Sequence, residues 1–386
     1  MEEKFWDEIR EEFPVTSHLA YFHSAGMSPI PTRVFETVVG AYERLNKFGD
    51  MYFLDDLERT NVLRGKLAEM LNTKTENVCY AHNTSTAFSF VAAALKKSGP
   101  AGFNLVSLED EFPASNVPFE FQGIPMKFVK PENSVYTVES ILDVVDENTL
   151  GVVCSHVQYS TGFMLEMEKL GKAIKERGLL FIVNATQSFP VYDVDVEKMH
   201  IDVLTVSFHK WGLCAVAGTL FFTSESFRKK YPGAMAGWLS VKPPADDFIP
   251  TQKNITYEAH ETAEQYNFGT MNFQALLGLD TAIEFYKEIG RERIRERINT
   301  LTDYLISQLR ELPVEIISPV DKPEYRSAII LINLKDADNL KAVEFLRKHN
   351  VVTSVRAGNI RIACNFFNNF KEIDQLINVL ELYMEM

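Results

Sequence analysis

Between about residues 75 and 225, short apolar runs alternate with longer segments of helical periodicity. The apolar runs are rich in β-branched residues and end in polar groups, as buried strands do. Because alternation of this kind builds a parallel sheet with helices on both faces, we predict an α/β fold with a central, mostly parallel sheet and a functional site at its carboxyl edge. The expected strands cover residues 78–81, 104–108, 126–129, 150–155, 179–183 and 203–206.

The chain has 386 residues, of which 46% are hydrophobic, so it can bury a large core and form more than one folding unit. We predict a large domain built on the parallel sheet and a smaller α+β domain at the C-terminal end. A stretch rich in proline and polar residues, 228–262, is interpreted as a long functional loop. The expected limits are 1–20 for an N-terminal arm, 21–275 for the large domain and 276–386 for the small domain, with a helix over 276–312 as connector.

The formal net charge is −14, and the lysines and arginines form no dense run, which argues against nucleic acid and anionic membrane as partners. The acidic N-terminus lacks the basic and apolar regions of a secretory signal, and no apolar run reaches the roughly 18 residues of a membrane span. We therefore expect a cytoplasmic enzyme. The cysteines at 79, 154, 214 and 364 contain no C-x-x-C pair, which indicates neither a disulfide framework nor a zinc site.

Within residues 179–222, Lys210 comes shortly after a predicted strand. The strand predicted over 179–183 is followed by Asn-Ala-Thr-Gln. The strand predicted over 203–206 is preceded by Asp202 and followed by Ser-Phe-His-Lys and a turn with glycine. This order resembles the pyridoxal-phosphate (PLP) site of fold-type I enzymes, and more narrowly the class V aminotransferase family, which includes cysteine desulfurases and isopenicillin-N-epimerase-like proteins. The resemblance extends in family order from Tyr21 to Asp374. It implies a fold-type I transferase fold, pyridoxal 5′-phosphate as cofactor and a Schiff base on Lys210.

The resemblance also implies which residues hold the phosphate of the cofactor. A Thr-rich turn at the start of a helix, matched here by Thr84, Ser85 and Thr86, would bind it with free backbone N–H groups. Simple N-capping is the alternative explanation for small hydroxyl residues at a helix start. Ser207 and His209 would hold the phosphate from the end of the strand.

Three further residues are implied at the ring and at the neighbouring subunit. Gln187 would bind the ring oxygen, and Phe112, in Glu-Asp-Glu-Phe-Pro-Ala-Ser-Asn, would stack on the ring face unless it is simply a core residue. Thr270, in a Gly-Thr turn, would reach the phosphate of the cofactor in the neighbouring subunit. That would make a homodimer part of the site, whereas a plain helix cap at Thr270 is the alternative. Gln158 lies where the family has polar residues near the ring oxygen or the substrate.

Asn184 departs from the family pattern, in which an Asp pairs with the pyridine nitrogen and keeps it protonated. Losing a charge-assisted hydrogen bond worth roughly 1.5 to 3 kcal/mol would lower the pKa of that nitrogen by about one to two units. Three explanations stay open: a reaction that relies less on electron withdrawal by the ring, such as racemisation or elimination; a cofactor-binding relative with reduced catalysis; or an Asn introduced in place of the natural residue.

Arg361, within Ile-Arg-Ile-Ala-Cys-Asn, matches the family arginine that grips the substrate carboxylate, for which a planar, bidentate donor suits better than Lys. Arg356 is a second candidate. The resemblance thus predicts an amino-acid substrate and chemistry at its α-carbon, by transamination or epimerisation. Desulfurases of the family carry a cysteine on a mobile loop that follows the arginine corresponding to Arg356. In this sequence the chain runs directly from Arg356 into the predicted strand that holds Cys364. A desulfurase-like β-elimination is therefore the alternative, as is a non-catalytic PLP-binding relative.

Overall fold

The computed structural model describes residues 2–242, 257–335 and 337–386. Its main sheet has seven strands in the order β2-β8-β7-β6-β5-β3-β4. Within this sheet β8 runs antiparallel to both of its neighbours, and the pairs from β7 to β4 are parallel, so the predicted mostly parallel sheet is confirmed. The strands are β2 Val78–Ala81, β3 Asn104–Leu108, β4 Met126–Val129, β5 Thr149–Ser155, β6 Leu180–Asn184, β7 Val203–Ser207 and β8 Thr219–Thr223.

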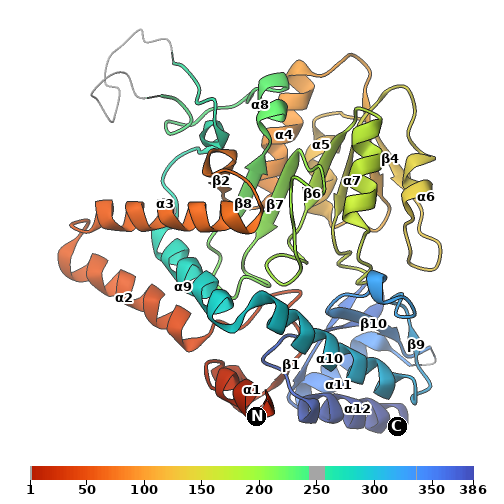
Figure 1. Ribbon diagram of the computed structural model, residues 1–386. Helices are drawn as coiled ribbons and strands as arrows, with labels where there is room; N and C mark the ends of the chain where they lie inside the picture. The colour runs from red at the N-terminus through yellow and green to blue at the C-terminus, as the bar shows by residue number, and fades with distance from the viewer. Residues whose placement is uncertain (1, 243–256, 336) are drawn as a thin grey trace.

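Helices cover both faces of this sheet (Figure 1) because alternate side chains of each strand point to opposite faces. Along β6, Phe181 and Val183 belong to the core that includes Leu170 of α7, whereas Ile182 belongs to the core that includes Phe88 of α4. The near-continuous apolar runs of the sequence are thus buried on both sides. The helices after β2 are α4 Thr84–Ser98, α5 Val117–Phe121, α6 Val138–Leu142, α7 Met167–Glu176 and α8 Glu225–Lys230.

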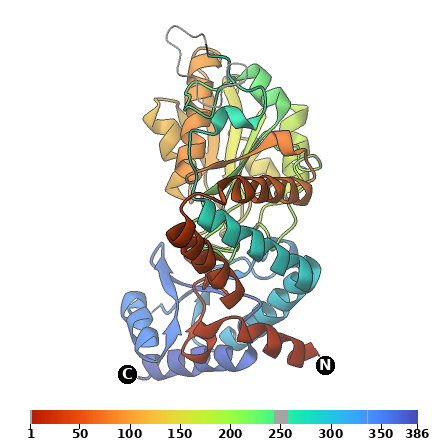
Figure 2. The same ribbon diagram turned by 90° about the vertical axis from the view of Figure 1, so that its left-hand side faces the viewer.

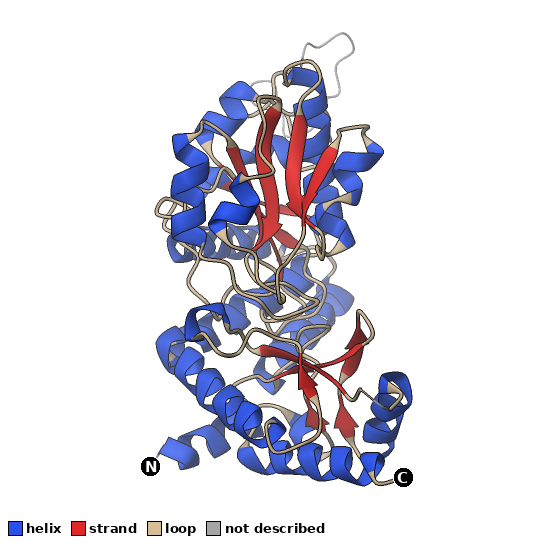
Figure 3. Ribbon diagram, turned by 90° about the vertical axis from the view of Figure 1, so that its right-hand side faces the viewer, coloured by secondary structure: helices blue, strands red, loops and turns tan. Residues whose placement is uncertain are grey.

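A second, antiparallel sheet in the order β12-β13-β10-β9 forms the C-terminal part, and Figure 3 shows it apart from the main sheet. The N-terminal segment joins this part, because β1 Ala20–Tyr21 pairs in parallel with β11 Val351–Val352. Both chain ends therefore lie near the smaller sheet (Figure 1). Its elements are β9 Glu315–Ile316, β10 Ile329–Asn333, α11 Asn339–Lys348, β12 Ser354–Arg356, β13 Asn359–Ala363 and α12 Phe370–Met384.

The prediction of a single connecting helix over 276–312 is wrong, because two helices, α9 Phe273–Ile289 and α10 Arg291–Leu309, occupy this region. Gly290 separates them at φ +91°, a backbone conformation that residues with a Cβ rarely adopt. Helix α9 packs against α2 Thr32–Phe48 and α3 Phe53–Met70, whereas α10 packs against α12. The domain limits themselves stay a prediction.

The N-terminal arm forms α1 Glu2–Glu11, which buries Trp6 against Phe366. The stretch interpreted as a long loop, 228–262, begins inside α8, and its residues 243–256 lie outside the described residues. No helix in the described ranges has the length and apolarity needed to cross a membrane. Short 3-10 helices complete the chain: η1 Pro14–Ser17, η2 Thr75–Asn77, η3 Pro113–Ser115, η4 Ala263–Tyr266 and η5 Pro323–Tyr325.

Candidate functional site

A cavity of about 280 Å³ lies where the carboxyl ends of β5, β6 and β7 meet the start of α4, as the parallel sheet predicts. The second sheet closes it with β12 and β13, and the loop after β1 contributes Ala25 and Gly26. Most residues singled out in the sequence line this cavity, whereas Thr86 and Thr270 do not. Those that line it are Thr84, Ser85, Phe112, Asn184, Gln187, Ser207, His209, Lys210, Arg356 and Arg361.

Lys210 follows β7 on a tight turn and is half-buried. Gly212 closes this turn, since a Cβ there would meet the backbone oxygen of Phe208 at 2.6 Å. Burial, together with the positive charges of Arg361 and Arg356, lowers the pKa of Lys210 to about 7. A large share of the amine is therefore neutral near pH 7, which is the form that attacks an aldehyde.

Arg361 lies on β13 and is 1% exposed, and only part of its guanidinium is hydrogen-bonded by the protein. Its Nη1 donates to the backbone oxygen of Tyr159 at 3.3 Å, while Nε and Nη2 have no protein partner. Burial and the neighbouring Arg356 lower its pKa to about 9, so it stays cationic at neutral pH. Because a buried guanidinium is costly without an anion, the edge of Arg361 formed by Nε and Nη2 is suited to a bidentate carboxylate.

The first turn of α4 has backbone N–H groups that could bind an anion. Asn83 caps the helix by accepting a hydrogen bond from the backbone N–H of Thr86, so this amide is already used. The backbone N–H groups of Thr84 and Ser85 in the same turn have no partner within the helix. The Thr84 and Ser207 hydroxyls lie 2.9 Å apart and bring β7 against this helix start. The site can thus hold a phosphate, with Thr84 and Ser85 as its N–H donors and Thr86 outside it.

Phe112 is 42% exposed at the cavity, so it is no core residue. Its ring centroid lies 5.4 Å from Lys210 Nζ and 5.2 Å from the ring of Tyr159. Gln187 also lines the cavity, but its amide already bonds the protein: it donates to the oxygen of Ala25 and accepts from the indole of Trp211. A bond from Gln187 to a cofactor would use its second Nε2 proton.

Asn184 ends β6 and is 6% exposed. Its Oδ1 accepts the backbone N–H of Thr186 at 3.1 Å, and its Nδ2 donates to Ser115 Oγ at 3.2 Å. These two bonds fix the amide plane at the cavity wall. Gln158, by contrast, does not line the cavity, because its Nε2 donates to Glu111.

Several groups of the site were not predicted from the sequence. Tyr159 and Ser155 line the cavity, and burial, together with the positive charges of Arg361, Arg356 and Lys210, lowers the pKa of His23 to about 4. His209 has a pKa of about 4 for the same main reason, burial, so both imidazoles are neutral at pH 7.

The cavity is electropositive. Among the described residues that line it, Lys210, Arg356 and Arg361 can carry positive charge, and none is Asp, Glu or Cys. All four cysteines are buried elsewhere, and burial raises the pKa values of Cys79 and Cys364 to about 12. The site therefore suits an anionic ligand and contains no thiolate.

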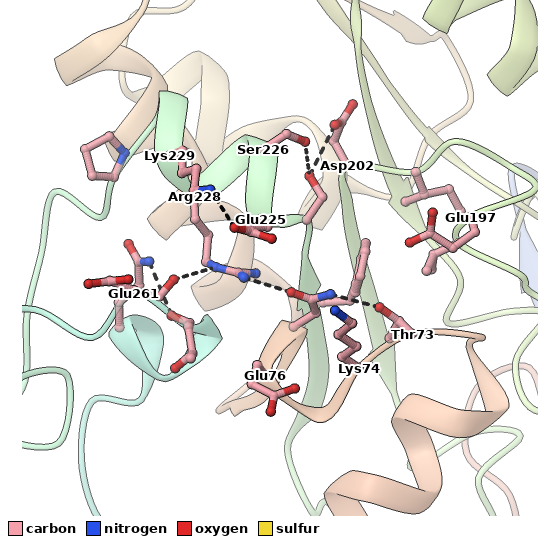
Figure 4. A pocket seen from close by; sticks show the side chains of 18 of the residues that line it. Thr73, Lys74, Glu76, Glu197, Asp202, Glu225, Ser226, Arg228, Lys229 and Glu261 are labelled. Carbon is pink, nitrogen blue, oxygen red and sulfur yellow. Dashed lines mark hydrogen bonds and ion pairs between the residues drawn. The ribbon is translucent and has the colours of Figure 1, made fainter.

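A larger cavity, of about 1290 Å³, lies at the end of the main sheet opposite the first cavity, where the parallel strands begin. Figure 4 shows side chains that line it. It is formed by the turn before β2, the residues before β7 and those after the antiparallel β8. Its polar side chains largely pair with one another: Arg228 donates to Asn77 at 2.8 Å, and Ser224 to Asp202 at 3.3 Å. Its lysines, Lys74, Lys175 and Lys229, are all exposed, whereas Lys210 is half-buried, so among the described residues the smaller cavity is the better catalytic candidate.

Comparison with known proteins agrees with this assignment. The family model described as Aminotransferase class-V matches residues 20–372. A probable cysteine desulfurase of Pyrococcus abyssi is 23% identical over 97% of this chain and 96% of its own. Among solved structures, the apo cysteine desulfurase of Thermococcus onnurineus NA1 has a TM-score of 0.87 at 21% identity, covering 98% of both chains.

A second solved protein, the cystine C-S lyase C-DES, was determined in complex with its reaction product cysteine persulfide; the TM-score is 0.85 at 18% identity, over 96% of this chain and 99% of that one. Another structure of C-DES carries glycine covalently linked to its PLP cofactor. At these identities the likeness shows the fold, and the match of the family model over most of the chain shows the family. The chain belongs to the class V aminotransferase family.

Proposed function

We propose that the protein is a PLP-dependent enzyme that acts at the α-carbon of an amino acid, with the cofactor attached to Lys210. One observation carries this proposal: an amine with a pKa of about 7 shares a small, acid-free cavity with a buried guanidinium that lacks partners for two of its nitrogens. An aldehyde-bearing anion and a substrate carboxylate together would satisfy both groups.

The residues present fit the cofactor. Thr84 and Ser85 at the start of α4, with Ser207 and His209, would hold the phosphate, Phe112 would cover the ring, and Asn184 would bond the ring nitrogen. When bound, PLP supplies an aldehyde for covalent attachment and a ring that withdraws electrons from the substrate α-carbon.

The remaining groups act on the substrate. Arg361 orients the carboxylate through Nε and Nη2, with Arg356 adding positive charge at the same end. Lys210 would take the α-proton of the substrate and return it, because a large share of its amine is neutral near pH 7. Neutral His23 and His209 add no competing charge.

For the reaction, we propose transamination or epimerisation as the first candidate. The second candidate is β-elimination at a C–S bond, which is favoured by the cysteine-desulfurase names of the relatives and by the fold shared with the C-S lyase C-DES. A desulfurase that passes sulfur to its own cysteine is not supported, because no cysteine lines the described cavity and Cys364 is fully buried directly after β13. A relative with reduced catalysis, owing to Asn184, is the remaining alternative.

Replacing Lys210 tests the attachment. We expect Lys210→Ala to abolish both the visible absorbance of the cofactor and the adduct trapped by borohydride. Lys341→Ala, which removes an exposed lysine on α11, should keep both. An adduct that persists in Lys210→Ala would show that the assigned lysine is wrong.

A panel of amino acids in D₂O, with and without a keto acid, separates the reaction classes. Exchange of the α-proton shows catalysis at the α-carbon. Amino transfer to the keto acid, inversion without transfer, or release of sulfide or persulfide from cysteine and cystine identifies the class. Absence of exchange with every member of the panel would favour the relative with reduced catalysis.

We also propose that the protein is cytoplasmic and works as a homodimer whose site is shared between subunits. Large apolar side chains are exposed along one side of α2, at Phe35, Val39 and Tyr42, a spacing that puts them on one helical face. Contiguous exposed apolar surface of this kind marks interaction sites. Thr270 is exposed and does not line the cavity of its own subunit. It precedes α9, the helix that packs on α2.

A further inference from the structure

Behind the cavity wall, a chain of hydrogen bonds links Asn184 to the buried carboxyl of Glu111. Asn184 Nδ2 donates to Ser115 Oγ at 3.2 Å, and the Ser115 hydroxyl in turn bonds Glu111. Glu111 is 6% exposed and Ser115 is fully buried. The carboxyl group of Glu111 is therefore linked to Asn184 by two successive hydrogen bonds through Ser115. Asn184 stands at the position where the family pattern has an Asp.

Glu111 is held by a dense set of donors. The backbone N–H and the hydroxyl of Ser155 both donate to it, the latter at 2.6 Å, and Gln158 Nε2 donates at 2.8 Å. With the Ser115 hydroxyl these bonds favour the carboxylate form, although burial outweighs them and raises the pKa of Glu111 above its usual value. Ser155 also lines the cavity and lies beside Asn184 across the β5–β6 pair.

In the ranges that the structure describes, the groups that bond Glu111, namely Ser155, Gln158 and Ser115, are all neutral. Burial and, to a smaller extent, the negative charge of Glu111 raise the pKa values of Tyr136, Cys154 and Tyr159, and the adjacent Asp110 bonds Tyr136. None of these is cationic. A buried carboxylate with four donors and no counter-ion is costly unless a positive charge arrives with a ligand. The protonated ring nitrogen of a pyridine is such a charge, and Asn184 is the residue of the relay that faces the cavity.

We propose that Glu111 supplies, through Ser115 and Asn184, the negative charge that keeps the ring nitrogen of the cofactor protonated. Glu111 touches neither cofactor nor substrate, so it is a positioning residue. The relay orients the Asn184 amide, and polarisation along the hydrogen bonds makes its Oδ1 a better acceptor for the ring N–H. The donors to Glu111 and the positive charge of a protonated ring nitrogen both favour the carboxylate form of Glu111, so the relay needs no transfer of a proton. This inference rests on the proposed function.

The protonation of the ring nitrogen can be measured directly. The apoprotein is loaded with PLP carrying ¹⁵N in the ring, and the ¹⁵N chemical shift is followed against pH in the wild type and in variants. We expect Glu111→Gln to lower the pKa of the ring nitrogen by about one unit or more, because the paired charge is lost. In Glu111→Gln/Asn184→Asp, a carboxylate at the ring itself should return this pKa to the wild-type value or above.

Asp110→Asn is the matched control, since it removes a negative charge one residue away whose side chain bonds Tyr136 instead of the relay. Its ring-nitrogen pKa should equal that of the wild type. Melting temperatures of each apoprotein separate folding defects from charge effects. If Glu111→Gln does not fold, Ser115→Ala, which cuts the relay, should lower the same pKa.

The outcomes are distinct. A wild type that forms no adduct with PLP at Lys210 refutes the proposed function. A wild type that binds PLP, with a ring-nitrogen pKa unchanged in folded Glu111→Gln or in Ser115→Ala, refutes the relay alone. Failure of the double variant to restore the pKa shows that Glu111 acts on the fold and not through its charge.

Discussion

At the scale of single residues, the cavity places three basic side chains together, and Lys210 is the one whose ionisation the others control. Burial and the charges of Arg361 and Arg356 lower its pKa to about 7. A lysine at its usual value near 10.4 would be almost fully protonated and unreactive at neutral pH. The arginines that bind the anionic parts of a substrate therefore also prepare the nucleophile.

Cofactor uptake should follow this ionisation. Below pH 7 the amine is protonated and attack is slow; above pH 7 it is neutral and uptake is faster. Arg361→Gln removes a charge that holds the pKa down, so the rate profile should move to higher pH. Stopped-flow absorbance of the apoprotein mixed with PLP measures it. Arg310→Gln, which removes an exposed and distant arginine, serves as control. An unshifted profile in Arg361→Gln would contradict the electrostatic coupling.

Arg361→Lys should mainly weaken binding of the substrate carboxylate. Lys replaces a planar fork by a single point donor, and the loss of one charge-assisted bond, roughly 1.5 to 3 kcal/mol, corresponds to roughly a 10- to 100-fold weaker amino-acid affinity. The visible band of the bound cofactor should remain. Arg356→Lys should have a smaller effect, since Arg356 already donates to the oxygen of Val355. Equal effects of the two variants on substrate titrations would argue against Arg361 as the carboxylate ligand.

At the scale of elements, local sequence patterns predicted the strands well. The limits of β2, β3 and β4 agree with the predicted ranges 78–81, 104–108 and 126–129, because each run is apolar and bounded by turn residues. The connecting helix was predicted over 276–312 without a break, although the pattern changes to a charged one from about residue 291 and Gly290 was a signal for a helix end.

The site was predictable only in part, for reasons of sequence separation. Lys210, Ser207 and Asn184 sit at strand ends, and the sheet order brings such ends together. The link between Asn184 and Glu111 joins residues from a strand end and a loop 73 positions apart through Ser115, and no periodicity encodes a contact of that kind.

The turn after β7 gives an element-scale prediction. Gly212→Ala should misplace Lys210, because a Cβ would overlap the oxygen of Phe208, and overpacking of this kind costs about 1 to 3 kcal/mol. Thermal unfolding and cofactor occupancy should both fall. Gly65→Ala is the matched change inside α3, where a Cβ meets only Thr75 Oγ1 at an ordinary 3.7 Å, so it should be neutral or stabilising. Full occupancy in Gly212→Ala would show that the turn tolerates a side chain.

At the scale of the whole molecule, α2 and α3 form one side of the molecule next to α9, and Figure 2 faces this side. Helix α2 is apolar on two faces: Val34 and Ala41 are buried, while Phe35 and Tyr42 are about half exposed or more. The exposed face suits a second copy of the chain, since homo-oligomers bury surfaces of this kind.

If the proposed dimer forms through that face, a charge placed there should disrupt it. Tyr42→Asp, within the exposed stripe formed by Phe35, Val39 and Tyr42, is expected to give a monomer in light scattering at concentrations where the wild type is dimeric. Glu43→Gln, one position along the helix and away from the stripe, should remain dimeric. A dimeric Tyr42→Asp would place the interface elsewhere.

If the dimer shares its sites, two defective subunits should complement each other. Lys210→Ala lacks the attachment point, and Thr270→Ala lacks the residue predicted to reach the phosphate of the partner. In a mixed dimer, the subunit with Thr270→Ala keeps its own Lys210 and receives Thr270 from the other subunit, so one site is intact. Random pairing of equal amounts then restores about a quarter of the wild-type sites, measured as borohydride-trapped cofactor at limiting PLP. If Thr270 instead acts within its own subunit, every site of the mixture carries one defect and co-expression restores nothing.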